Sequence, residues 1–167
     1  MFDAPEKIED SDMVSRLVFF PHMEGNGDDL IAPLMFFEFP QGQPESVVWR
    51  QRCLQDSDVH ALGCAAEAKK WEEAKKRGRT LNDTYKGFRS ALAGVVRACR
   101  SRRGHGFHVE YAPKEGVHHA EISYAPNENP AEPGLRQSDK QELRLYLHRL
   151  FSPLSPHSCS SDPIAIP

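Results

Sequence analysis

Two imidazoles and two carboxylates recur at alternate positions in one short stretch of the chain. The stretch GFHVEYAPKEGVHHAEISYAP, residues 106–126, carries His108, Glu110, His119 and Glu121. Apolar residues occupy the intervening positions, which is the period-two pattern of half-buried strands. A Pro-Lys-Glu-Gly turn at 113–116 separates the strands, and a loop of even length would pair Glu110 with His119 and His108 with Glu121. The sequence therefore predicts a hairpin with all four side chains on one face.

Two His–Glu pairs on one sheet face are compatible with several kinds of chemistry. They could hold a divalent cation such as zinc or manganese, or act as general acid and base in a metal- or His/Glu-dependent nuclease or other hydrolase. Opposite charges are also favourable cross-strand neighbours on a solvated face, and we favour this interpretation, with no bound metal. None of the H-E-x-x-H, G-x-S-x-G or P-C-x-x-C motifs occurs in the chain.

A concentration of cations forms a second candidate site. Residues 69–103 hold 12 basic and 3 acidic side chains, whereas residues 1–68 hold 4 basic and 13 acidic ones. Apolar residues from Tyr85 to Cys99 recur at helical spacing, which predicts a helix over about 83–103. That helix would gather its cations in one sector and at its end, namely Lys86, Arg89, Arg97, Arg100, Arg102 and Arg103.

An all-basic helix face is typical of proteins that bind polyanions. Arginine donates bidentately to phosphate, and like charges four residues apart destabilise an ordinary solvated helix. We therefore expect a small nucleic-acid-binding protein, for DNA or RNA, that could belong to a nucleoprotein assembly. In the hydrolase alternative the arginines would hold phosphates. Two further alternatives involve the acidic N-terminal third of the chain. This third could neutralise the basic face internally, or the protein could be an interaction or inhibitor module that acts through this acidic third.

The elements that must position these residues follow from periodicity and turn chemistry. We expect strands near 14–21, 31–40 and 46–53, helices at about 56–77 and 83–103, the hairpin, and a last helix near 138–151. The order βββααββα predicts an α+β fold, with an antiparallel or mixed sheet of about five strands and about three helices packed on one face. We expect one domain over 13–152, a flexible acidic N-terminus at 1–12 and a flexible tail at 153–167.

Cysteine spacing and hydropathy suggest the compartment. Cys53, Cys64, Cys99 and Cys159 are widely spread and form no C-x-x-C pair, which predicts free thiols, with Cys159 in the flexible tail. No apolar run approaches the roughly 18 residues of a membrane span. The N-terminus is acidic, unlike a secretory signal, so we expect a cytoplasmic protein without membrane contact.

Overall fold

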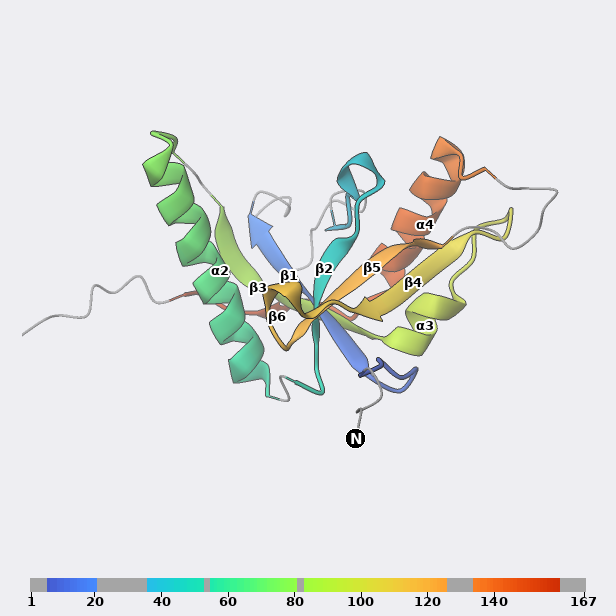
Figure 1. Cartoon of the computed structure of the whole chain (residues 1–167), viewed down its shortest axis with the longest axis horizontal. Coiled ribbons are helices and arrows are strands. Elements are labelled where there is room, and N and C mark those ends of the chain that lie inside the picture. Colours follow the sequence, from blue (N-terminus) through green and yellow to red (C-terminus); the bar gives the residue numbers. More distant parts are fainter. Residues whose placement is uncertain (1–5, 21–35, 53–54, 81–82, 126–133, 160–167) are drawn as a thin grey trace, which may run out of the picture.

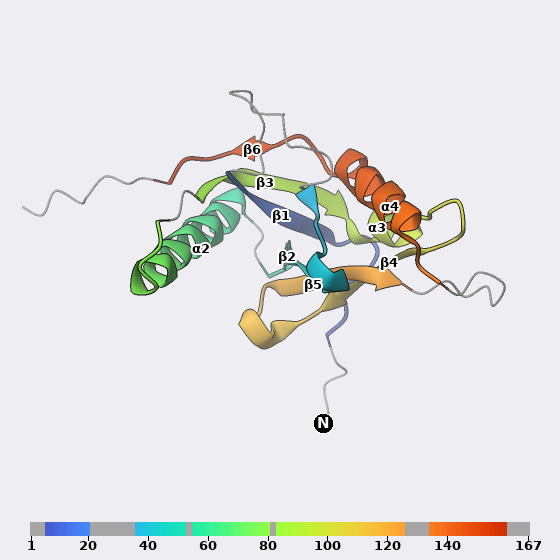
Figure 2. The same cartoon turned by 90° about the horizontal axis from the view of Figure 1, so that it is seen from above.

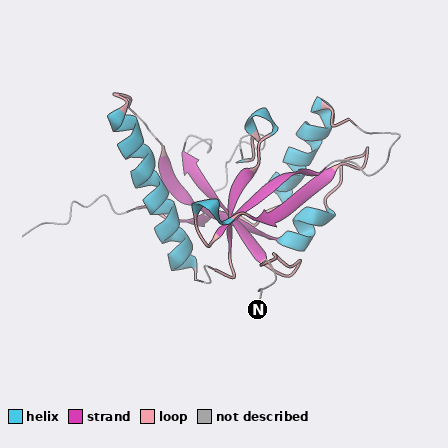
Figure 3. Ribbon diagram, in the orientation of Figure 1, coloured by secondary structure: helices cyan, strands magenta, loops and turns pink. Residues whose placement is uncertain are grey.

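The fold is an antiparallel sheet with helices on both faces. The computed structural model describes residues 6–20, 36–52, 55–80, 83–125 and 134–159. Within these ranges the sheet has six strands in the order β4-β5-β2-β1-β3-β6, and every neighbouring pair is antiparallel (Figures 1 and 3). The α+β class and the antiparallel sheet are therefore confirmed, although the strand order along the chain differs from the expected one.

Strands and helices alternate along most of the described chain. The strands are β1 (Met13–Phe20), β2 (Glu45–Trp49), β3 (Thr84–Leu92), β4 (Gly106–Tyr111), β5 (His119–Ala125) and β6 (Ser155–Pro156). The helices are α2 (Asp56–Lys76), α3 (Ala93–Ala98) and α4 (Gln137–Leu150), with short 3-10 turns at Pro40–Gly42 and Pro113–Glu115.

The helices are divided between the two faces of the sheet, contrary to the expectation of one covered face. Residues of α3 and α4 join Val47 and most of the aromatic side chains in the larger core, whereas Val59 of α2 packs with Val48 and Phe88 on the opposite face. Figure 2 shows α2 and α4 on different sides of the sheet. Val47 and Val48 are adjacent and are 3% and 4% exposed, which requires both faces of β2 to be covered.

The predicted helix over 83–103 is wrong. Residues Thr84–Leu92 form strand β3, and only Ala93–Ala98 are helical. The pairing of β3 with β1 shifts between Val18 and Phe19, so that no residue of β1 lies opposite Lys86 and Tyr85 lies on the same face as Phe88. This bulge produces apolar residues three apart on one face of a strand, the spacing from which a helix was predicted.

The expected strand at 31–40 is also wrong where the structure describes it. Residues 36–42 form no strand, and residues 31–35 lie outside the described ranges. Phe36, Phe37 and Phe39 are instead 2%, 0% and 4% exposed, and they form edge-to-face and stacked ring contacts in the larger core. The described part of the segment therefore contributes aromatic side chains to the core without pairing as a strand, and its Phe39 N–H donates to the Glu45 carboxylate of β2 at 3.0 Å.

The described residues at both ends of the chain contact the rest of the domain. Ile8 is 1% exposed in the larger core, and the backbone of Asp10 accepts the Gly94 N–H at 2.9 Å. At the other end β6 pairs with β3, and the chain remains attached to α2 at Cys159. Residues 6–12 and 153–159, which fall within the segments expected to be flexible, thus make contacts with the rest of the domain. None of the helices in the described ranges is long and apolar enough to span a membrane.

Candidate functional site

The β4–β5 hairpin forms, with its four ionisable residues on one face, but in a different register. Glu110 lies opposite Glu121 and His108 opposite Ser123, so the predicted pairs of Glu110 with His119 and His108 with Glu121 are wrong. The loop takes six residues, 113–118, because a 3-10 turn at Pro113–Glu115 precedes Gly116, whose φ is 140°. An even loop length preserves the face of each side chain while moving the register by two residues.

His119 bonds through both ring nitrogens. Its Nδ1 lies 2.6 Å from the Ala112 carbonyl oxygen and its Nε2 lies 2.8 Å from Ser46 Oγ. A carbonyl can only accept, so Nδ1 carries the proton and Nε2 accepts the Ser46 hydroxyl proton. This arrangement leaves neutral His119 no lone pair for a metal. The four hairpin residues therefore do not come together as a cation site in this structure.

The Ser46–His119 pair opens into a cleft between α2 and the sheet. The cleft has a volume of about 440 Å³ and is walled by Leu62, Lys69 and Lys70 on the α2 side. The Glu115 carboxylate lies 3.8 Å from His119 Nε2 at the cleft margin. His119 is 7% exposed, and Val48, its cross-strand partner in β2, is 4% exposed. A hydroxyl hydrogen-bonded to an oriented imidazole is the geometry of a nucleophile with its general base.

Arg89 belongs to the interior rather than to a basic surface. It is 8% exposed, and its guanidinium donates to the carbonyl oxygens of His148, Phe151 and Ser152 at the C-terminal end of α4. The guanidinium carbon also lies 4.4 Å from the centre of the Phe36 ring. Cations stabilise the unpaired carbonyls at a helix C-terminus. We conclude that Arg89 stabilises the fold.

Arg97 and Arg100 also make internal contacts. Arg97 donates to the Asp10 carboxylate at 2.8 Å and to the Ile8 and Val109 carbonyl oxygens at 2.7 Å. Arg100 donates to the Cys99 carbonyl oxygen at 2.8 Å and to that of Arg97. The Arg97–Asp10 pair is the contact expected if the acidic N-terminal third neutralises basic residues internally.

The remaining predicted phosphate ligands do not share one face. Arg103 donates to the Asp139 carboxylate at 2.7 Å, and the backbone N–H of Arg102 donates to Glu142 at 2.9 Å. Lys86 lies at the β3 bulge, where its carbonyl oxygen accepts the His157 N–H at 2.9 Å. Because the region is a strand, a short helix and a loop, helical periodicity does not gather these cations.

Some of the predicted phosphate ligands and some of the predicted hairpin residues line a second cavity. A space of about 860 Å³ beside the edge strand β4 is lined by Arg97 and Arg100 together with His108 and Glu110. Lys7, Glu6 and Asp10 line its other side, so basic and acidic groups are mixed there. The lining holds three basic side chains, Lys7, Arg97 and Arg100, and three acidic ones, Glu6, Asp10 and Glu110, so the cavity has no concentrated positive charge.

Five of the seven exposed basic residues in 69–103 lie at the C-terminal end of α2, and Arg100 and Arg102 are the other two. Residues 69–79 contain six basic and two acidic side chains. The five exposed basic residues are Lys69, Lys75, Lys76, Arg77 and Arg79, and within the described ranges their side chains form no ion pair. Lys70 is held 3.4 Å from Asp83. This end of α2, which we call the basic tip (residues 69–79), lies at one extremity of the molecule (Figure 1).

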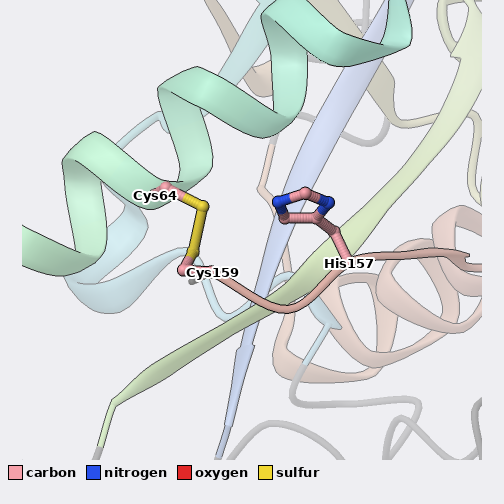
Figure 4. A group of neighbouring side chains, drawn as sticks. All are labelled: Cys64, His157 and Cys159. Carbon is pink, nitrogen blue, oxygen red and sulfur yellow. A yellow bond between two sulfur atoms is a disulfide. The ribbon is translucent and has the colours of Figure 1, made fainter. Parts of the chain in front are cut away.

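The sequence interpretation missed a cysteine–histidine cluster. Cys64 of α2 and Cys159 form a disulfide with a Cα–Cα distance of 5.6 Å, so the prediction of free thiols is wrong for both. His157 lies beside the disulfide (Figure 4), and one donor atom from each of the three residues falls within 4.8 Å of the others. A signal existed in His60-x-x-x-Cys64 and His157-x-Cys159, because His60 and Cys64 share one helix face.

The other two cysteines have different outcomes. Cys99 is a free, half-buried thiol as predicted, and burial raises its pKa to about 11. Such a thiol is protonated at neutral pH and is a poor nucleophile. Cys53 lies outside the described residues.

The two candidate regions, the Ser46–His119 cleft and the basic tip, are adjacent because Lys69 and Lys70 belong to both. The cysteine–histidine cluster lies elsewhere along α2, toward its N-terminal half. No protein family, curated protein or solved structure that we compared with this chain matches it.

Proposed function

We propose that the protein binds nucleic acid through the basic tip of α2 in the cytoplasm. The observation that carries the proposal is the division of the positive charge in residues 69–103. Arg89, Arg97 and Arg103 bind internal carbonyl or carboxylate oxygens, whereas the exposed cations of the basic tip lack such partners among the described residues. Phosphate contacts made by exposed lysine and arginine release counterions and supply most non-specific affinity.

Trp71 strengthens the choice of nucleic acid over other polyanions. Its side chain is 44% exposed in the middle of the basic residues, and its indole N–H donates to the Asp83 carbonyl oxygen at 2.6 Å. That bond holds the ring in place while part of its surface stays open to solvent. An aromatic ring among cations can stack on unpaired bases, which favours single-stranded nucleic acid.

Fluorescence anisotropy with labelled single-stranded DNA, duplex DNA and single-stranded RNA tests the proposal. The triple variant Lys75→Ala, Lys76→Ala, Arg77→Ala should weaken binding by roughly tenfold or more at low salt, because three phosphate contacts are lost. Alanine retains helix propensity, so circular dichroism should show α2 intact.

A matched variant separates local contacts from total charge. Lys7→Ala, Lys140→Ala, Arg149→Ala removes the same three charges from other elements and should leave the affinity nearly unchanged. Equal weakening by both triple variants would show that the net charge of the protein, and not the basic tip, determines the affinity. No binding by the wild-type protein to any of the three probes would overturn the proposal and favour an acidic protein partner.

Trp71 provides a second arm of the same experiment. Trp71→Ala should weaken single-strand binding by about 1–3 kcal/mol, the value of one base–aromatic stack, and should affect duplex binding less. Trp71→Phe keeps an aromatic ring without the N–H and should retain most of the affinity. An equal loss of affinity in both variants would show that Trp71 acts through its N–H bond to the Asp83 carbonyl oxygen and not by stacking on bases.

The Ser46–His119 pair supports a second proposed function, hydrolysis by a serine nucleophile. Ser46 Oγ would attack an electrophilic carbonyl or phosphoryl centre while its proton passes to His119 Nε2, and His119 would give that proton to the leaving group as its bond to the centre breaks. A water molecule, deprotonated by His119, would then release the acyl or phosphoryl group from Ser46. The Ala112 carbonyl holds the imidazole in the required tautomer. The neighbouring Lys69 and Lys70 would favour an anionic substrate in the cleft.

A fluorophosphonate probe followed by intact mass and peptide mapping tests this second function. We expect one adduct on Ser46, none in Ser46→Ala, and labelling slowed by roughly a hundredfold or more in His119→Ala. Ser57→Ala changes an exposed serine outside the cleft and should be labelled like the wild type. The absence of an adduct on wild-type Ser46 would make the pair a structural hydrogen bond.

A further inference from the structure

The side chains around the Cys64–Cys159 disulfide bring together three donors of the kinds that hold a metal ion. Cys64 Sγ, Cys159 Sγ and an imidazole nitrogen of His157 lie within 4.8 Å of one another. Zinc–sulfur bonds are about 2.3 Å long, so two ligands of one zinc ion are at most about 4.6 Å apart. The three donors therefore need only small movements to reach one ion. Figure 4 shows the His157 ring beside the sulfur bridge, on the segment that follows β6.

His60, on the same face of α2 as Cys64, is the candidate for a fourth ligand, although it lies outside the group whose donor atoms fall within 4.8 Å of one another. Its ring stacks on the His157 ring, with centroids 4.3 Å apart and an interplanar angle of 12°. His60 Nδ1 lies 2.9 Å from the Tyr85 hydroxyl. When Nδ1–H donates to that oxygen, Nε2 carries the free lone pair. A histidine that ligates a metal usually donates its other ring N–H in this way.

The backbone holds the two halves of the cluster together independently of the sulfur bridge. β6 pairs with β3, and the His157 N–H donates to the Lys86 carbonyl oxygen at 2.9 Å. A Cβ at Gly63 would lie 2.2 Å from the Tyr85 ring, so the glycine lets α2 pack closely against β3 near Cys64 and His60. The donor set would therefore persist when the disulfide is opened.

We propose that the reduced protein binds one zinc ion through Cys64, Cys159 and His157, with His60 as the fourth ligand. Two thiolates and two imidazoles in a tetrahedral arrangement are a donor set that zinc prefers. The disulfide and the metal would then be alternative links between α2 and the C-terminal segment, selected by the redox state.

The redox steps balance with simple reagents. A phosphine or a dithiol gives two electrons to the sulfur bridge, and two protons complete the thiols of Cys64 and Cys159. Zinc binding then displaces these two protons and forms two zinc–sulfur bonds. Hydrogen peroxide reverses the process: the two thiolates lose two electrons, the disulfide re-forms, zinc is released, and peroxide with two protons becomes two water molecules.

The test compares metal binding by the oxidised and reduced protein. The purified chain is reduced with a phosphine, loaded with ZnCl₂, desalted and assayed for zinc, while intact mass reports the two hydrogens gained on reduction. Cobalt loading provides a second readout, because tetrahedral Co²⁺ with thiolate ligands has characteristic visible and charge-transfer absorption. We expect one metal ion per reduced chain and none per oxidised chain, with release on addition of peroxide.

Single variants assign the ligands. His157→Ala and His60→Ala should each lower the zinc affinity at least tenfold and alter the cobalt spectrum. Cys159→Ser should have the same effects, and this chain cannot form the Cys64–Cys159 disulfide in the first place. Cys99→Ser changes the free thiol outside the cluster and should bind like the wild type. His60→Ala with wild-type affinity and spectrum would remove His60 from the ligand set.

The absence of stoichiometric metal in the reduced wild-type chain would overturn the proposal. So would undiminished binding by a Cys64→Ser, Cys159→Ser chain whose circular dichroism is that of the wild type. Nucleic-acid affinity is measured separately at the basic tip, so failure of either proposal leaves the other intact.

Discussion

At the residue scale, Arg89 shows how a cation that suggests phosphate binding can instead complete a helix. In the sequence Arg89 stands among arginines with no acidic residue nearby. In the structure it is buried against three backbone carbonyl oxygens, one in the last turn of α4 and two directly after it. Four carbonyl groups at a helix C-terminus lack intrahelical partners. Arg89 of β3 donates hydrogen bonds to these carbonyl groups and so links β3 to α4, the last helix in the described ranges.

We predict that Arg89→Met lowers the free energy of unfolding by about 2–3 kcal/mol, because buried carbonyl oxygens lose charged donors. Urea unfolding followed by circular dichroism measures the change. Arg149→Met removes an exposed arginine near the same end of α4 and should change stability by less than about 0.5 kcal/mol. Similar values for the two variants would contradict the role given to Arg89.

Asp139 is the buried carboxylate that joins the start of α4 to the loop before β4. It is 1% exposed, and it accepts the Arg136 N–H at 2.9 Å, the Arg103 guanidinium at 2.7 Å and the Ser101 hydroxyl at 3.3 Å. Burial alone would raise the pKa of Asp139, but these donors and the nearby His105 outweigh it and lower the pKa below 3.8. The negative charge is thus stabilised in the folded state.

The sign of the pH dependence follows from that lowered pKa. The unfolded chain has the higher pKa and binds more protons, so the contribution of Asp139 is complete above the ordinary aspartate pKa of about 3.9. It is lost as the pH falls through the folded value. We predict that Asp139→Asn costs about 2 kcal/mol at pH 7 and that the difference shrinks in strongly acidic buffer. Urea titrations across this range should show the convergence, and a constant difference would contradict it.

At the scale of elements, β3 shows why periodicity alone predicted the wrong structure. Phe88 and Leu92 are four residues apart, a spacing that places side chains on one face of a helix and also of a strand. The bulge at Lys86 then brings Tyr85, three residues before Phe88, onto that same face. The bulge is set by pairing with β1, which local sequence does not specify, whereas the uninterrupted period of β4 and β5 predicted the two strands and their shared face but not their register.

Gly87 is required where β6 meets this bulge. Its φ is 135°, and a Cβ there would lie 2.0 Å from the Ser155 carbonyl oxygen. We predict that Gly87→Ala detaches β6 and costs about 1–3 kcal/mol, partly as backbone strain. Amide exchange at His157, which bonds Lys86, should accelerate markedly.

Gly78→Ala is the matched control for Gly87. Gly78 also has a positive φ, 65°, but a Cβ there meets nothing within 4 Å. This variant carries the backbone strain without the clash and should leave exchange at His157 unchanged. Unaltered exchange at His157 in Gly87→Ala would contradict the proposed requirement.

At the scale of the whole molecule, the candidate sites depend on contacts that sequence distance conceals. Ser46 and His119 are 73 residues apart and meet only because β2 pairs with β5. Cys64 and Cys159 are 95 residues apart and meet because β6 returns to β3. Fold class, the hairpin, α2 and α4 follow from local pattern, whereas the strand order, the disulfide and the burial of the arginines follow from tertiary packing.

The charge asymmetry of the chain also changes meaning in three dimensions. The excess of nine positive charges in residues 69–103, twelve basic against three acidic, predicted one basic surface. The structure separates most of it into arginines that bind internal oxygens and cations exposed at the basic tip, while Arg100 and Arg102 are exposed away from the tip. Nucleic-acid binding should therefore respond to substitutions in α2 and should be insensitive to Arg97 and Arg100.

The salt dependence of binding to duplex DNA tests this central claim most directly. Each lost phosphate contact reduces the slope of log affinity against log salt by about 0.9. Lys75→Ala, Lys76→Ala, Arg77→Ala should therefore flatten the wild-type slope by roughly 2–3. Arg97→Ala, Arg100→Ala, with folding confirmed by circular dichroism, should keep the wild-type slope. An unchanged slope in the first variant with a flattened slope in the second would contradict the assignment of binding to the basic tip.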